Sequence, residues 1–188
     1  MLTVDRLKDA EIIPTVIDDF VPSMFLEARW SSGQAALGNT LEPKKLEDAP
    51  SVFLSGHGNR DAQFVITLTD PDAPSRKNPK WSEFCHWIAT GIEISGGDAD
   101  SLTFRLAKSS EVMPYKPPGP PEGTGKHRYV FLALVPQNGT TEKLHLSKPS
   151  DRQHWGYCTD EGETRGVREW AKENGLTPVA ANFIYAKH

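Results

Sequence analysis

Short apolar runs predict that this chain folds mainly as β-strands. Residues 24–30 place Met24, Leu26, Ala28 and Trp30 on one face, which is the two-residue pattern of a half-buried strand. Six further segments have strand character: Ser51–Leu54, Phe64–Thr69, His86–Ile92, Leu102–Leu106, Tyr129–Val135 and Val179–Tyr185. The expected fold class is therefore mainly β.

Two segments predict helices at the periphery of this β fold. Thr3–Ile12 has apolar residues at helical spacing, and Pro14 stops it because a proline ring cannot continue a helix. Arg165–Asn174 is the stronger helix, with Thr164 as its N-cap and Gly175 as its stop.

Polar residues gather where two predicted strands end or begin. Asp70 and Asp72 directly follow the strand Phe64–Thr69, and two prolines in this turn prevent the strand from continuing. His127 and Tyr129 lie at the start of another apolar run. Each segment delivers polar side chains to a strand end, so the sequence predicts a site there.

The longest connection, Ala107–Lys126, contains five prolines. A segment of this length without regular structure is unusual as passive filler in a compact domain. We interpret it as a binding loop.

Composition and charge limit the classes of protein to which this chain can belong. With 188 residues, 37% of them hydrophobic and 24% charged, it fits one globular domain over residues 1–188. The net charge of −4 gives no electrostatic field that favours nucleic acid. No apolar run approaches the ~20 residues of a membrane span, the first residues lack a signal-peptide core, and the few cysteines make no disulfide scaffold. We therefore expect a cytoplasmic protein that contacts membranes at most peripherally.

Three motifs occur in order along the chain. They are Asp-Pro-Asp-Ala-Pro-Ser-Arg at 70–76, Cys-His-Trp at 85–87, and Tyr-Lys-Pro-Pro-Gly-Pro-Pro-Glu-Gly-Thr-Gly-Lys-His-Arg-Tyr-Val-Phe at 115–131. Their order, spacing and strand context resemble the phosphatidylethanolamine-binding protein family, and the segments 36–41 and 179–183 extend the resemblance to nearly the whole chain. Within that family, the segments 37–43 and 181–185 are most similar to the branch of the fungal carboxypeptidase Y inhibitor and the Raf kinase inhibitor protein.

The resemblance implies one large antiparallel sheet packed on a smaller sheet, with peripheral helices and a small anion pocket at one edge. The residues that the resemblance assigns to this pocket are Asp70, Asp72, Ala73, Pro74, His86, Trp87, Pro118, Gly125, His127 and Tyr129. It also implies a cis peptide between Ala73 and Pro74. Because a carboxylate favours the charged form of a nearby imidazole, we expect Asp70 beside His86 to hold a cation or a dipole aimed at a phosphate, with Tyr129 adding a hydroxyl donor.

Several of these residues also have a simpler structural explanation. Asp70 and Asp72 are of the type that caps backbone amides in turns, and His86 fits a buried core histidine. Arg128 is expected to pair with a carboxylate. The tryptophans expected in the core are Trp81, Trp155 and Trp170.

The resemblance implies a non-enzymatic regulatory protein with no cofactor, no metal and no catalytic residues. Its small ligand would be a phosphate or carboxylate anion, or the headgroup of phosphatidylethanolamine. Its protein partner would be a serine carboxypeptidase that it inhibits, or a kinase of Ras/Raf-type signalling. We expect the segment Met1–Arg6 to make the protease contact; the alternative is that Met1–Ile12 only packs on the domain. The alternative is a hydrolase that uses the histidines and aspartates as metal ligands or as acid and base. The sequence contains no His-x-x-x-His spacing and no Gly-x-Ser-x-Gly elbow to favour that alternative.

Overall fold

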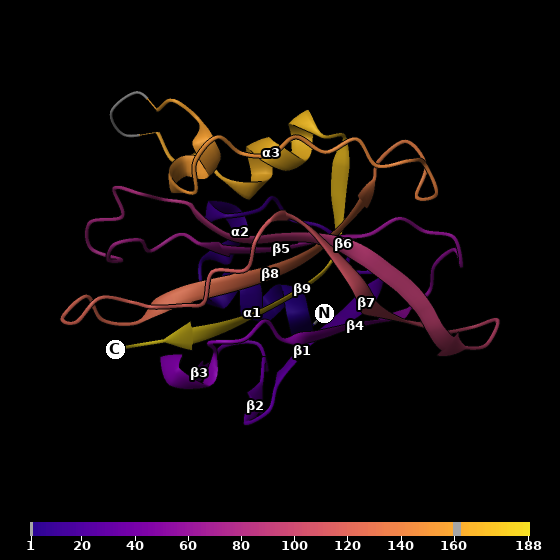
Figure 1. The fold of residues 1–188 in the computed structure, drawn as a ribbon, viewed down its shortest axis with the longest axis horizontal. Helices are drawn as coiled ribbons and strands as arrows, with labels where there is room; N and C mark the ends of the chain where they lie inside the picture. Colours follow the sequence, from indigo (N-terminus) through magenta and orange to yellow (C-terminus); the bar gives the residue numbers. More distant parts are fainter. Residues whose placement is uncertain (1, 160–162) are drawn as a thin grey trace.

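Figure 1 shows a computed structural model of the chain, which describes residues 2–159 and 163–188; Met1 of the expected protease-contacting segment lies outside them. The strands are β1 (Met24–Trp30), β2 (Gly33–Gln34), β3 (Asn39–Leu41), β4 (Ser51–Gly56), β5 (Val65–Asp70), β6 (Phe84–Gly97), β7 (Leu102–Met113), β8 (His127–Pro136) and β9 (Leu176–Ala186). The helices are α1 (Leu2–Asp9), α2 (Ile12–Thr15) and α3 (Val167–Glu173), with the short 3-10 helices η1 (Pro43–Lys45) and η2 (Gln153–Gly156). The predicted mainly β class is confirmed.

The strands form one curled sheet in the order β2-β1-β4-β7-β6-β5-β8-β9-β3. Neighbouring strands are antiparallel, except that β3 runs parallel to β9. The curl brings β1 back toward β9, where the Asn182 amide donates to the Leu26 carbonyl at 2.9 Å. The large and small layers of the expected fold are therefore continuous through the pairing of β4 with β7.

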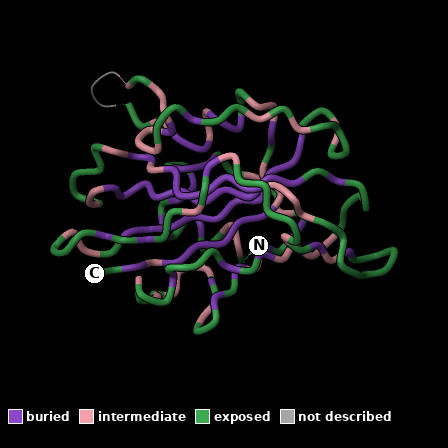
Figure 2. Tube along the Cα trace, viewed as in Figure 1, coloured by how far each residue is buried: buried purple, intermediate pink, exposed green. Residues whose placement is uncertain are grey.

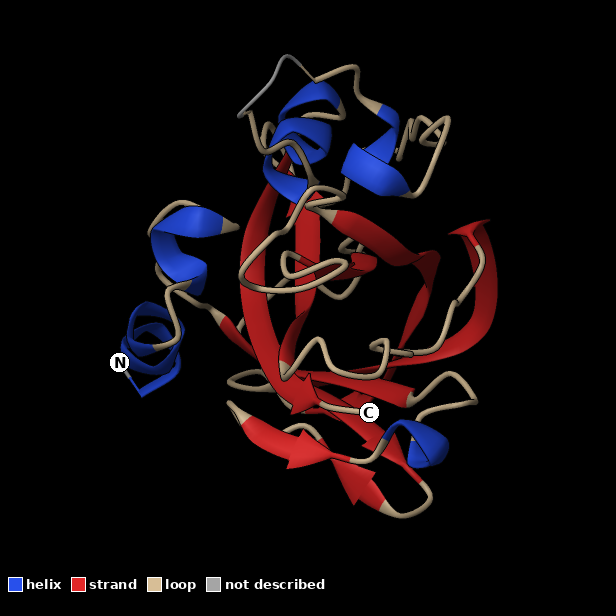
Figure 3. Cartoon of the chain, turned by 90° about the vertical axis from the view of Figure 1, so that its left-hand side faces the viewer, coloured by secondary structure: helices blue, strands red, loops and turns tan. Residues whose placement is uncertain are grey.

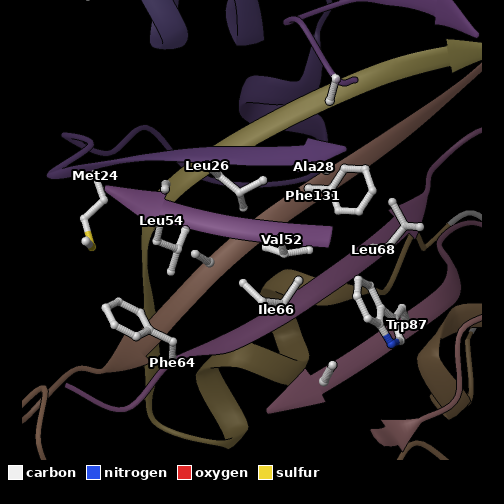
Figure 4. Packing of buried hydrophobic residues seen from close by; sticks show 14 of the residues in the cluster. Met24, Leu26, Ala28, Val52, Leu54, Phe64, Ile66, Leu68, Trp87 and Phe131 are labelled. Carbon is white, nitrogen blue, oxygen red and sulfur yellow. The ribbon is translucent and has the colours of Figure 1, made fainter. Parts of the chain in front are cut away.

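Hydrophobic side chains fill both faces of the central strands. Between the layers, Leu26, Leu54, Ile66 and Phe131 point toward one another from four strands (Figure 4). Beyond the other face, the helices lie on the outside of the sheet (Figure 3) and bury Leu7, Val130, Leu132, Trp155 and Trp170. Figure 2 shows the result as a buried centre with exposed loops. β5 and β8 are buried throughout, which explains the continuous apolar run Val130–Val135 of β8 and the lack of exposed polar positions in β5.

The long hairpin of β6 and β7 corrects one prediction. The strand expected at Leu102–Leu106 continues to Met113, so interpreting Ala107–Lys126 as one irregular loop is wrong for residues 107–113. Residues 107–111 are exposed, and 108–111 are polar, because β4 pairs with β7 only at Leu102–Arg105 and leaves one edge of this segment uncovered. It therefore lacks the alternating pattern from which a strand is predicted. The irregular segment is residues 114–126, which we call the proline-rich loop.

The predicted helices exist with different bounds. The first ends at Asp9 rather than Ile12, because Glu11 adopts a left-handed φ of 56° before Pro14 is reached. α3 begins after Gly166 rather than Thr164, and Gly175 ends it with φ 62°, as predicted. Among the described residues, no helix is long and apolar enough to cross a membrane.

Candidate functional site

The candidate site lies at one edge of the sheet, where three neighbouring strands begin or end. β5 ends at Asp70, and the strands on either side of it, β6 and β8, begin at Phe84 and His127. Asp70 and Phe84 face each other in register, and a register shift between Leu68 and Thr69 leaves His86 of β6 without a paired residue on β5. The antiparallel pairing therefore brings together the polar residues that the sequence places at separate strand ends.

A cavity of about 190 Å³ opens at this edge. Its lining consists of Asp70, Ala73, Pro74, Trp81, Phe84, His86, Lys116, Pro117, Gly119, Pro120, Pro121, His127 and Tyr129. Four of these, Asp70, His86, His127 and Tyr129, are buried polar side chains, and we call them the floor. The more exposed Trp81, Phe84 and Lys116 form what we call the rim. A space this small suits a phosphate or a small carboxylate rather than a whole lipid.

Asp70 connects the polar groups of the floor. Its Oδ1 accepts the N–H of Asp72 at 2.7 Å, and its Oδ2 accepts Nδ1–H of His127 at 2.9 Å. Nε2 of His127 lies 2.9 Å from the Thr124 hydroxyl oxygen. Burial, and then the Asp70 carboxylate, raises the pKa of Tyr129, which is also hydrogen-bonded to Asp70. Tyr129 therefore remains a neutral hydroxyl.

His86 is held by the backbone of the proline-rich loop. Its Nδ1 lies 2.6 Å from the Lys116 carbonyl, and Lys116 N–H donates to the His86 carbonyl at 2.8 Å. Burial lowers the pKa of His86 to about 4, although the Asp70 carboxylate acts in the opposite direction. Of the two forms expected for His86 beside Asp70, a cation or a dipole, the cation is therefore wrong, because burial outweighs the carboxylate. The hydrogen-bond partner of Asp70 is His127.

Asp72 lies behind the cavity and pairs with Arg128. The guanidinium donates to both carboxylate oxygens, at 2.6 and 2.9 Å, and the Arg128 backbone N–H adds a third bond at 2.8 Å. Both side chains are buried. The prediction that Arg128 pairs with a carboxylate is confirmed, and the pair fixes the turn after β5 against β8.

Of the other predicted pocket residues, some line the cavity and others do not. Ala73 and Pro74 line the cavity, and the peptide between them is cis, as the resemblance implies. Outside the lining, Trp87 lies in the core with its indole N–H on Glu111 at 3.2 Å. Pro118 and Gly125 lie in the proline-rich loop and are also outside the lining.

The tryptophans and the rim show what sequence reasoning missed. Trp155 and Trp170 are buried as predicted, whereas Trp81 lines the rim, so its prediction as core is wrong. Phe84 and Lys116 were not predicted, although Phe84 immediately precedes the Cys-His-Trp motif and Lys116 follows Tyr115 in the third motif. Their positions inside or beside the motifs were the available signal.

One arginine outside all three motifs supports the cavity from behind. The Arg152 guanidinium donates to the carbonyls of Cys85 at 3.0 Å, His86 at 3.3 Å and Pro114 at 2.7 Å. It thereby joins the start of β6 to the start of the proline-rich loop. Nothing in the sequence connects Arg152 to these partners, because the contacts are made to main-chain carbonyls.

The connected side chains of Asp70, His127 and Thr124 have the order of an acid, a base and a hydroxyl nucleophile. The Thr124 hydroxyl, however, donates to the Pro121 carbonyl at 2.7 Å, so its one hydrogen is directed away from His127. Thr124 is also outside the residues that line the cavity. Its geometry favours orienting His127 over nucleophilic attack. In residues 2–159 and 163–188, no three His, Cys, Asp or Glu side chains come together as a possible metal site.

Comparison with known proteins places this fold and these motifs in one family. Residues 31–184 match the family model described as phosphatidylethanolamine-binding protein. The chain belongs to the phosphatidylethanolamine-binding protein family. It is 36% identical to the carboxypeptidase Y inhibitor of Saccharomyces cerevisiae, in an alignment that covers 98% of this chain and 94% of the inhibitor.

Solved structures agree with this assignment. A crystal structure of carboxypeptidase Y inhibitor complexed with its cognate proteinase matches with a TM-score of 0.84 at 35% identity, covering 99% of this chain and 95% of the inhibitor. The phosphatidylethanolamine-binding protein from Plasmodium vivax matches with a TM-score of 0.74 at 22% identity, over 98% and 97% of the two chains, and shows the shared fold. The resemblance predicted from the motifs is confirmed.

Proposed function

We propose that this member of the phosphatidylethanolamine-binding protein family is a non-enzymatic inhibitor of a serine carboxypeptidase, and that its cavity binds a small oxyanion. The observation that carries the inhibitor role is the 36% identity to carboxypeptidase Y inhibitor over 98% of this chain. The alignment covers 98% of this chain, so it is not limited to the three motifs.

The N-terminal helix α1 is the segment that we expect to contact the protease. A specific protein interface needs roughly 800 Å² from each partner, and a cavity of about 190 Å³ does not offer such an area. α1 lies outside the sheet (Figure 3), with Leu2 65% exposed and Leu7 buried as its anchor. The first turn is therefore accessible while the domain stays folded.

The oxyanion role of the cavity rests on its size and on the charges around it. Lys116 is part of the rim, Lys80 places its ammonium 5.5 Å from the ring of Trp81, and Arg152 lies behind His86. Asp70, the carboxylate of the lining, is already bonded to His127. A small anion, such as the phosphate of a phosphatidylethanolamine headgroup, is the ligand that this surplus of cations favours.

Inhibition of purified carboxypeptidase Y tests the protease role. We expect the full chain to inhibit, and deletion of residues 1–6 or the milder change Leu2→Asp to weaken inhibition at least about tenfold, which corresponds to ~1.4 kcal/mol of binding free energy. His86→Ala, inside the cavity, is expected to retain inhibition. Circular dichroism checks that each variant is folded. No inhibition by the full chain would reject the role, and a loss confined to His86→Ala would place the protease contact at the cavity.

A further inference from the structure

The N–H and O–H groups of the floor side chains already form hydrogen bonds with other groups of the protein. Nδ1–H of His86 donates to the Lys116 carbonyl at 2.6 Å, and both ring nitrogens of His127 have partners. The Tyr129 hydroxyl is bonded to Asp70, whose carboxylate has no hydrogen to give. The atoms left for a ligand are acceptors: Nε2 of His86, which has no partner in residues 2–159 and 163–188, and the oxygens of Asp70 and Tyr129.

The charges around the cavity nevertheless favour an anion. Lys116 carries an ammonium at the rim, 5.7 Å from the centre of the Phe84 ring, and the Arg152 guanidinium lies behind His86. Among the lining side chains outside the floor, Lys116 and Trp81 carry hydrogen-bond donors, an ammonium and an indole N–H. A ligand thus meets donors and positive charge at the rim and acceptors at the floor.

An anion that carries an acidic hydrogen matches both the positive charge at the rim and the hydrogen-bond acceptors at the floor. A fully ionised oxyanion would set its lone pairs against those of His86 Nε2 and Asp70, and each buried polar group left unpaired costs ~1–3 kcal/mol. An alkylammonium has the hydrogens but is repelled by Lys116 and Arg152. A singly ionised phosphomonoester has a negative charge and one P–OH group.

Building on the anion binding proposed above, we propose that the cavity selects the monoanion of a phosphomonoester, whose P–OH donates to Nε2 of His86 while its ionised oxygens face Lys116 and Trp81. A phosphodiester, which is the form of phosphate in a phospholipid headgroup, lacks the P–OH and binds more weakly. The cavity is thereby selective for the ligand's protonation state as well as for its charge.

The surroundings of His86 prevent the ring from supplying the missing hydrogen near pH 7. The charged and titratable groups packed against it are Asp70, Lys116, Arg152 and Tyr129. Burial holds the pKa of His86 at about 4, with Arg152 and Lys116 lowering it further and Asp70 opposing them. The ring is therefore neutral, with its hydrogen on Nδ1.

Isothermal titration calorimetry with phosphorylethanolamine between pH 5.5 and pH 8.5 tests the proposal. The second pKa of a phosphomonoester is about 6, so its monoanion becomes roughly tenfold rarer with each pH unit above that value. We expect the dissociation constant to rise about tenfold between pH 7 and pH 8, in step with this loss. Titrations in buffers of different ionisation enthalpy should show uptake of close to one proton. Glycerophosphorylethanolamine, the diester headgroup, should bind at least about tenfold more weakly at pH 5.5, a loss of ~1.4 kcal/mol.

Two matched histidine variants locate the effect. His86→Gln supplies an amide N–H at every pH, so it should flatten the pH dependence for phosphorylethanolamine. His154→Gln is the control, because His154 Nδ1 is bonded in the same way to the Ser82 carbonyl at 2.7 Å but lies outside the lining. It should keep the pH dependence of the full chain.

Three results would overturn the proposal: binding by the full chain that does not change with pH, equal or tighter binding of the diester, or equal binding of ethanolamine without its phosphate. Absence of binding at every pH would instead reject the anion-binding role from which the proposal starts.

Discussion

Replacing Glu83 with glutamine should remove a large pH dependence of the free energy of unfolding. Glu83 is 2% exposed and lies between the sheet and the start of α3. Its Oε1 accepts the Val167 N–H and the Thr69 hydroxyl, both at 3.1 Å, and Trp155 N–H donates to that hydroxyl oxygen at 3.0 Å. Burial raises the pKa of Glu83 to about 8, against the lowering effect of these two hydrogen bonds.

The sign and size of the effect follow from proton linkage. Between the ordinary carboxyl pKa of 4.5 and the raised pKa of about 8, the folded protein holds a proton on Glu83 that the unfolded chain has released. The free energy of unfolding therefore falls as pH rises, by about 1.4 kcal/mol per pH unit, or about 4 kcal/mol between pH 5 and pH 8. Glu83→Gln has no titrating proton but keeps an oxygen acceptor for the Val167 N–H. Its free energy of unfolding should therefore lack this pH dependence.

Urea unfolding followed by tryptophan fluorescence between pH 5 and pH 8 measures the effect. The difference in free energy between the unchanged chain and Glu83→Gln is the informative quantity, because contributions from other groups cancel. Asp98→Asn is the control: the N–H groups of Asp100 and Ser101 lower the pKa of exposed Asp98, so its titration lies below this pH range. The difference in free energy of unfolding between the unchanged chain and Asp98→Asn should stay constant between pH 5 and pH 8. Equal pH slopes for the unchanged chain and Glu83→Gln would refute the reasoning.

Two further predictions separate the residues behind the cavity from those that line it. Asp72→Ala leaves the buried Arg128 guanidinium without its carboxylate, so urea unfolding should show a loss of about 3–5 kcal/mol. The same change at Glu27, whose pair with Arg29 is exposed, should cost less than about 1 kcal/mol. Trp81→Ala removes part of the rim and should reduce the affinity for phosphorylethanolamine in a nuclear magnetic resonance titration. Trp87→Phe, in the core, should lower stability and leave that affinity unchanged; the reverse result would show that the lining is assigned wrongly.

Strand positions were predictable where burial controls the sequence. β1 has the predicted bounds, because one of its faces packs in the core and the other faces solvent. β8 was found as an apolar run because helices and the opposite layer cover both of its faces. Residues 107–111 of β7 were missed because their own side chains are exposed, although their backbone pairs with the start of β6, where Ala89 faces Glu111 and Thr90 faces Ser110. Hydrophobic patterning carries no signal for a stretch of strand whose side chains are exposed.

The composition of the site was predictable, but the pairing within it was not. The motifs supplied the four floor residues, Asp70, His86, His127 and Tyr129. Which histidine bonds to Asp70 depends on how β6, β5 and β8 align at the sheet edge, and sequence spacing does not specify that alignment. Trp81 and Trp87 show the same limit: Trp87 is part of a motif but lies in the core, whereas Trp81 is outside the motifs and lies at the rim.

The chemistry of His86 depends on a group with no side-chain signature, the Lys116 carbonyl. A histidine in an anion pocket suggests a hydrogen-bond donor, yet this carbonyl takes the hydrogen of Nδ1 and leaves Nε2 as an acceptor. Lys116 precedes Pro117, which restricts Lys116 to extended backbone and helps to fix where its carbonyl points. The prolines of the loop therefore do more than shape the entrance of the cavity. By holding one main-chain carbonyl against His86, they determine which protonation state of a ligand the floor can accept.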